Sequence, residues 1–156
     1  MKQISRILIL IVFFTTQSCK INSTILSTPE VAMPTPENIA TVVYKNQQAT
    51  IKSKQTRIIT TNEAFTNLIT ELAIPATDYE TILNIDFKKH TLIACFMGEK
   101  PSSGFDVEIE KATIETNKIE LSLKEIEPKK GAMVLDVLTA PYVFIIVPKG
   151  KEITLN

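Results

Sequence analysis

Apolar positions from residue 39 onward follow two different periods, and each period predicts a different kind of element. One helical face is marked by apolar residues at i, i+3, i+4 and i+7: Phe65, Leu68, Ile69 and Leu72. Thr60 and Glu63 have the spacing of a capping box, and Pro75 cannot continue a helix. The pattern therefore predicts one main helix at about residues 62–73 that covers a core.

Most of the remaining chain shows strand patterns. Residues 105–110 and 119–124 alternate between apolar and polar side chains, which predicts strands with one buried face. Residues 91–97 form an unbroken apolar run, as expected of a central strand buried on both faces. Apolar runs at residues 132–139 and 142–147 predict two more strands.

Two further extended segments, residues 39–45 and 49–60, flank a polar turn near the start of this region. The second segment is polar enough for an edge strand or an irregular hairpin. Runs of strands with a single helix predict the α+β class with a mostly antiparallel sheet. We expect one such domain at residues 39–156.

The N-terminus has the pattern of a secretory signal peptide. Lys2 and Arg6 precede eight apolar residues at positions 7–14, a run too short to span the roughly 30 Å hydrocarbon core of a bilayer. Ser18 and Cys19 then resemble a bacterial lipobox, in which the cysteine is diacylated. We expect residues 1–18 to be removed and Cys19 to be lipidated; the alternative is a secreted protein with a free thiol at Cys19.

Residues 19–38 are rich in Ser, Thr, Asn and Pro and predict a linker between the lipid and the domain. No aspartate follows Cys19 at the second mature position, which is Lys20. By resemblance to lipoprotein sorting rules, this favours the outer membrane with the domain facing the periplasm. The membrane is thus one expected partner.

Composition and charge exclude several kinds of site. The 156 residues carry 17 basic and 17 acidic side chains, and this balance argues against nucleic acid as a partner. With one histidine and two cysteines, the chain lacks the ligand clusters of common metal sites. No glycine-rich nucleotide fingerprint is present, so we expect neither a metal nor a cofactor.

Two candidates for catalytic chemistry have simpler explanations. Cys95 lies within the most apolar run of the chain, which indicates a small buried side chain. Ser102 or Ser103 with His90 and an aspartate, Asp86 or Asp106, would be the components of a hydrolase triad, although no local motif supports one. A serine hydrolase is therefore a minor alternative.

A loop between two predicted strands is the candidate binding site. It contains a proline and a glycine and ends on an aromatic residue: Lys100, Pro101, Ser102, Ser103, Gly104 and Phe105. A rigid aromatic anchor on a restrained loop is typical of recognition surfaces. The alternative is a plain connection with Phe105 directed into the core.

Several short motifs resemble the PrcB C-terminal domain family over roughly residues 58–151. They comprise an aspartate–phenylalanine pair, a strand closing on glycine, a glycine-aromatic loop, a proline, a proline–tyrosine pair and a Val-Pro-Lys end: Asp86, Phe87, Gly98, Ser102, Ser103, Gly104, Phe105, Pro128, Pro141, Tyr142, Val147, Pro148 and Lys149. The family is named after an accessory lipoprotein that stabilises a surface protease complex. The resemblance implies a non-enzymatic, protein-binding domain, with a protease or another envelope protein as partner.

The same loop is also similar to the Asn-Pro-Thr-Thr-Gly-Tyr/Phe loop of chagasin-type inhibitors of cysteine proteases. The two other inhibitor loops of that family are missing from this sequence. An inhibitor that presents residues 101–105 to a protease is accordingly the alternative function.

Overall fold

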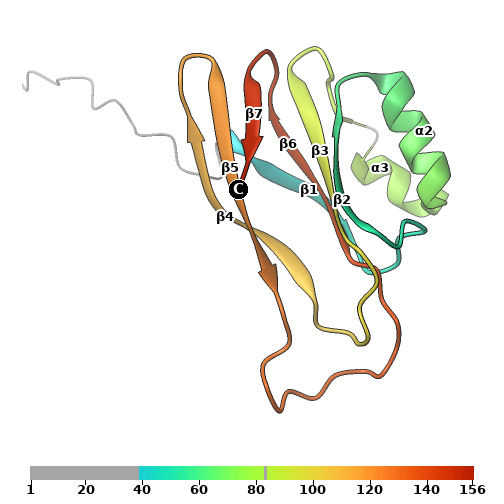
Figure 1. The fold of residues 1–156 in the computed structure, drawn as a ribbon. Helices are drawn as coiled ribbons and strands as arrows, with labels where there is room; N and C mark the ends of the chain where they lie inside the picture. The colour runs from blue at the N-terminus through green and yellow to red at the C-terminus, as the bar shows by residue number, and fades with distance from the viewer. Residues whose placement is uncertain (1–38, 83) are drawn as a thin grey trace, which may run out of the picture. The chain divides into compact units, whose positions relative to one another are not determined.

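Two β-sheets and a helical layer make up the part of the chain that a computed structural model describes, residues 39–82 and 84–156 (Figure 1). The strands are β1 (Thr41–Asn46), β2 (Lys54–Ile59), β3 (His90–Met97), β4 (Asp106–Ile114), β5 (Lys118–Ile126), β6 (Tyr142–Pro148) and β7 (Glu152–Leu155). The helices are α2 (Asn62–Leu72), a 3-10 turn (Ala76–Asp78) and α3 (Tyr79–Ile82). The predicted signal peptide, Cys19 and linker, residues 1–38, lie outside the described residues.

The two sheets differ in width. One has four antiparallel strands in the order β1-β6-β3-β2, and the other has three in the order β4-β5-β7, with β5 and β7 parallel. Strand β2 is at an edge, as its polar sequence predicts. The prediction of an α+β, mostly antiparallel fold with one main helix is confirmed.

Strands β3 and β6 lie between two separate cores because their successive side chains point to opposite faces. Leu92, Ala94 and Phe96 join a cluster that includes the apolar face of α2. Their neighbours Ile93, Cys95 and Met97 join a second cluster with residues of β4 and β5. Figure 1 shows the corresponding layers, with the helices on one side of the four-stranded sheet and β4, β5 and β7 on the other. The prediction that residues 91–97 form a strand buried on both faces is confirmed.

Helix α2 has the predicted apolar face but starts from a different cap. Its four predicted apolar residues are buried. Thr61, not Thr60, is the N-cap: its backbone is extended and its Oγ1 accepts a hydrogen bond from the Ala64 amide at 3.2 Å. The capping-box prediction for Thr60 and Glu63 is thus wrong by one residue. The helix ends at Ala73, whose left-handed backbone (φ 50°) turns the chain before Pro75.

The predicted strand at residues 132–139 does not form. This segment belongs to the long connection between β5 and β6, and its one β-bridge, between Thr139 and Lys100, is isolated and extends into no strand. Both edges of β6 are already paired, with β1 and β3, so the segment that precedes β6 has no free sheet edge beside it. An apolar run alone did not distinguish a strand from an exposed loop.

Substitutions at two adjacent residues of β3 test whether each face of the strand is buried in its own core. Leu92 and Ile93 are both fully buried, on opposite faces of β3. We expect Leu92→Ala and Ile93→Ala each to lower the free energy of unfolding by about 2–5 kcal/mol, because each leaves a cavity in its own core. Urea denaturation measures both, with the exposed Glu110→Ala as control. A sheet with only one buried face would tolerate one of the two changes.

Candidate functional site

Two loops meet at one end of the domain. Residues 98–105 follow β3, and residues 127–141 precede β6; both lie at the lower end of the view in Figure 1. Backbone hydrogen bonds join them: the Lys100 amide donates to the Thr139 carbonyl at 2.8 Å, and the Thr139 amide donates to the Lys100 carbonyl at 3.0 Å. The Ser103 amide donates to the Leu135 carbonyl at 3.0 Å. The loops therefore form one braced unit.

One side chain from each loop, Ser103 and Thr139, supplies a further brace. The Ser103 Oγ accepts a hydrogen bond from the Leu135 amide at 2.9 Å. The Thr139 hydroxyl donates to the Ser102 carbonyl at 2.9 Å. Serine side chains that satisfy backbone groups in this way order a loop without regular secondary structure. These contacts give Ser103 a structural role toward the second loop.

Gly104 is required where the two loops approach each other. Its φ is +93°, a conformation that favours glycine, and a Cβ added there would lie 3.2 Å from the Pro128 Cβ. The same added atom would lie 3.5 Å from a methyl group of Val134. Any larger residue would strain the backbone and crowd the neighbouring loop. Glycine at position 104 therefore allows the two loops to approach this closely.

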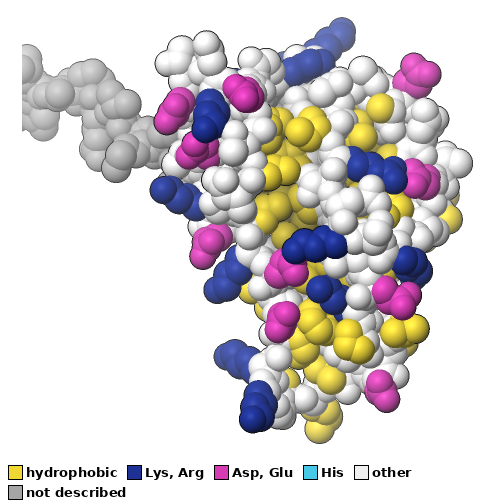
Figure 2. All heavy atoms as spheres, in the orientation of Figure 1, with side chains coloured by type: hydrophobic (Ala, Val, Ile, Leu, Met, Phe, Trp, Pro, Cys, Tyr) yellow, Lys and Arg dark blue, Asp and Glu magenta, His cyan; other side chains and the backbone are white. Residues whose placement is uncertain are grey.

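The second loop exposes an unusual amount of apolar surface. Five consecutive or nearly consecutive aliphatic residues are exposed by between 38 and 102%: Met133, Val134, Leu135, Val137 and Leu138. Figure 2 shows hydrophobic side chains gathered at the end of the molecule where the loops lie. Apolar patches of this kind mark interaction sites in soluble domains. The sequence pattern did not indicate this surface, because an apolar run at residues 132–139 predicts a strand.

Phe105 lies at the base of this unit and is only half exposed. Its ring packs against the cluster between the two sheets, and the Lys100 Nζ lies 5.3 Å from the ring centroid. Such a cation–π contact covers one face of the ring. Met133 and Leu135 extend further into solvent than Phe105 does. A recognition role for residues 100–105 stays a prediction, and the structure adds residues 133–138 beside them.

The components of the predicted triad are not brought together. His90 begins β3, and Ser102 follows its far end, so a strand of eight residues, roughly 25 Å long, separates them. The Ser102 hydroxyl donates to the Ser103 carbonyl at 3.1 Å. Asp106 pairs with Lys45 at 2.7 Å, and Asp86 pairs with Lys89. The geometry offers no support for the serine-hydrolase alternative.

Comparison with known proteins identifies the central part of the chain. Residues 91–148 match the family model described as PrcB C-terminal. This part of the chain, from β3 to β6, is PrcB C-terminal domain-like. The match runs from β3 to β6 and includes both loops, whereas Asp86, Phe87 and Lys149 of the predicted resemblance fall outside it. No curated protein and no solved structure matches the chain.

Other chemistry in the PrcB-like domain is limited. Cys95 is buried, and this burial raises the pKa of its thiol to about 11, so little reactive thiolate is present near neutral pH. Within residues 39–82 and 84–156, no three His, Cys, Asp or Glu side chains group as metal ligands would. Over the same residues, every helix is too short or too polar to cross a bilayer.

The two roles considered for Phe105 predict different results for one variant. Because the ring packs against the inter-sheet cluster of the PrcB-like domain, we expect Phe105→Ala to lower the free energy of unfolding by about 1–3 kcal/mol. Phe105→Leu, which keeps an apolar side chain, is the control and should lose less. Thermal or urea unfolding measures both. An unchanged stability of Phe105→Ala would show that the ring is not part of the core.

Proposed function

We propose that this chain is a non-enzymatic lipoprotein of the bacterial outer membrane whose PrcB-like domain binds another envelope protein. The binding surface would be the two braced loops, residues 100–105 and 133–138, called here the two-loop surface. PrcB C-terminal is an accessory-subunit domain and not a known catalytic family. The observation that carries the proposal is the exposed aliphatic side chains of the second loop.

The construction of the two-loop surface suits association with a folded partner. Hydrogen bonds with Ser102, Ser103 and Lys100 hold the apolar loop in place before any partner arrives. A loop that is already ordered loses less conformational entropy on binding. Exposed charges at Lys129, Lys130 and Glu127 lie beside the apolar segment, as a polar rim lies around an interface core.

The same geometry favours this proposal over an inhibitor that presents residues 101–105. An inserting loop needs its anchor free, but the Phe105 ring is half-buried and faces the Lys100 ammonium. The side chains available for docking are those of Met133, Leu135 and Leu138. Stabilising a protease or another envelope complex does not require entry into an active-site cleft, so these exposed side chains suit that role.

The test is affinity capture with variants of the two-loop surface. The full chain is tagged at its C-terminus and recovered from solubilised membranes of the bacterium that produces it. Replacing Leu135 and Leu138 with serine should weaken capture of its protein partner by about 30-fold, the effect of losing roughly 2 kcal/mol of contact energy. The melting temperature should not fall, because both side chains are exposed.

The control is Ile58→Ser, which removes another exposed aliphatic side chain, on β2 away from the loops. It should retain the partner fully. Equal recovery of the partner by the Leu135→Ser, Leu138→Ser variant would contradict the proposed surface. Equal loss in the Ile58→Ser control would show that the captured protein is held by nonspecific apolar contact.

The membrane anchor has a separate test. If Cys19 is diacylated, metabolic labelling with palmitate should mark the wild-type chain, and Cys19→Ala should remove the label. Two acyl chains hold a protein stably on a bilayer, so the variant should also move from the membrane to the soluble fraction. Labelling that persists in Cys19→Ala would contradict the predicted lipidation.

A further inference from the structure

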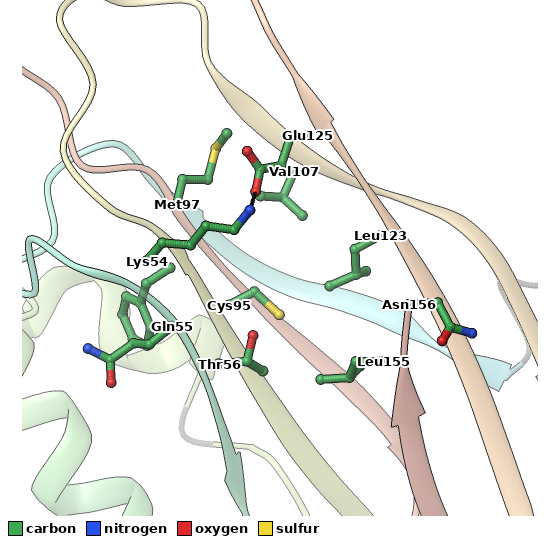
Figure 3. Close-up of a pocket in the computed structure, with 11 residues that line it drawn as sticks. Lys54, Gln55, Thr56, Cys95, Met97, Val107, Leu123, Glu125, Leu155 and Asn156 are labelled. Atoms are coloured by element: carbon green, nitrogen blue, oxygen red, sulfur yellow. Dashed lines mark ion pairs between the residues drawn. The ribbon is translucent and has the colours of Figure 1, made fainter.

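A cavity lies between the two sheets on the side of the domain where β2 and β7 form the edges. Its volume is about 550 Å³, and β2, β3, β4, β5 and β7 all contribute to its walls. Five apolar or sulfur-containing side chains line its interior: Cys95, Met97, Val107, Leu123 and Leu155. Figure 3 shows these side chains directed into the space between the strands. The volume falls within the range of about 300–1,000 Å³ that is usual for small-molecule sites.

The cavity exists because the narrower sheet covers the wider one incompletely. Strand β7 pairs with residues 118–121 of β5 only, so from Leu123 onward β5 is paired with β4 on one side but has no strand on its β7 side, where only the Asn156 carbonyl accepts a hydrogen bond from the Leu123 amide. Leu123 and Leu155 pack against the inter-sheet cluster and yet remain half exposed. Ile58 lies on the same face of the four-stranded sheet as Ile93 and is 51% exposed. Apolar surface that belongs to the sandwich interior is therefore open to solvent here.

Positive charge exceeds negative charge around Glu125 at the rim of the cavity, where Lys54 and Glu125 belong to the lining and Lys100 lies just behind them. The Lys54 Nζ lies 2.6 Å from one oxygen of Glu125, and the Lys100 Nζ lies 3.7 Å from the other. Two ammonium groups thus share one carboxylate. Figure 3 shows Lys54 reaching along the edge of the cavity to Glu125. The Lys54 side chain is 71% exposed, so it is able to move toward a second anion at little cost.

We propose that this cavity binds a small amphiphile, an aliphatic chain that ends in a carboxylate. The aliphatic chain would lie between the sheets against Leu123, Leu155 and Met97, where it would complete the apolar packing. The carboxylate would lie at the rim beside the exposed Lys54 ammonium, close to the two positive charges that share Glu125. This site is separate from the two-loop surface and does not depend on the proposed function.

Calorimetry with sodium dodecanoate below its micellar concentration tests the site. The protein is the full chain with Cys19→Ala, so that no lipid anchor is present. We expect one dodecanoate per chain. Dodecyltrimethylammonium, with the same chain and the opposite charge, should bind at least about tenfold more weakly, because the rim attracts anions. Hexanoate should also bind more weakly, because it buries less apolar surface.

Variants of the cavity provide matched controls. Lys54→Glu should weaken dodecanoate binding by about tenfold or more through charge reversal at the rim. Lys52→Glu makes the same charge change at an exposed residue outside the cavity lining and should have little effect. Leu155→Trp should fill the cavity and abolish dodecanoate binding. If the Leu155→Trp variant does not unfold in a cooperative thermal transition, Leu123→Phe serves as the cavity-filling variant instead.

Cys95 reports where the ligand binds. Its thiol lines the cavity and is the single cysteine left in the Cys19→Ala chain. Because this thiol is buried and its pKa is raised, its alkylation by N-ethylmaleimide is slow without ligand; saturating dodecanoate should slow it further, and dodecyltrimethylammonium at the same concentration should not. Absence of saturable binding, equal binding of both head groups, or binding that leaves Cys95 alkylation unchanged would overturn the proposal. Protection of Cys95 that rises with protein concentration without ligand would also overturn it, because a second copy would then cover the cavity.

Discussion

The burial of β3 and β6 on both faces is the constraint on which the rest of this structure depends. Each strand contributes alternate side chains to two cores, one under the helices and one between the sheets. Burying a single large aliphatic side chain contributes roughly 1.5–3 kcal/mol, so two adjacent strands that bury nearly every residue dominate the folding energy. The edge strands and α2 then need only one apolar face each. This division explains the continuous apolar runs at residues 91–97 and 142–147.

The same pair of strands determines where the two loops lie. Because β3 and β6 are antiparallel neighbours, the end of β3 lies beside the start of β6, with Phe96 opposite Tyr142. The loop that leaves β3 and the loop that enters β6 therefore begin at adjacent points. The Met97 amide donates to the Pro141 carbonyl at 3.0 Å, which continues the pairing toward the bridge at Lys100 and Thr139. A rigid platform thus supports the exposed aliphatic side chains of residues 133–138.

Much of this framework was predictable from the sequence because burial leaves a periodic signal. The helical face of α2, the central strand β3 and the alternating strands β4 and β5 all follow from apolar spacing. The N-cap was predicted one residue early, since Thr60 and Thr61 are both acceptable caps and only the backbone geometry distinguishes them. Residues 132–139 were placed in a strand, because apolar composition does not show whether a sheet edge is available beside a segment.

The cavity between the sheets was beyond prediction for a different reason. It arises from the unequal widths of the two sheets and from the short pairing of β7, and neither follows from the pattern of any one strand. Sequence reasoning correctly placed Cys95 in the interior. It gave no indication that the thiol lines an open space. This cavity and the braced loops depend on how separate elements lie together in space. Such features cannot be predicted from the pattern of any single segment.

Native-state hydrogen exchange measured residue by residue tests the central claim most directly. If β3 and β6 are the platform, their hydrogen-bonded amides should exchange most slowly, with opening free energies equal to that of global unfolding. The edge strand β2 and the amides of residues 129–134 should exchange faster, while the Leu135 and Thr139 amides retain the protection given by their braces. Exchange of β3 amides at the rate of those in β2 would contradict the account.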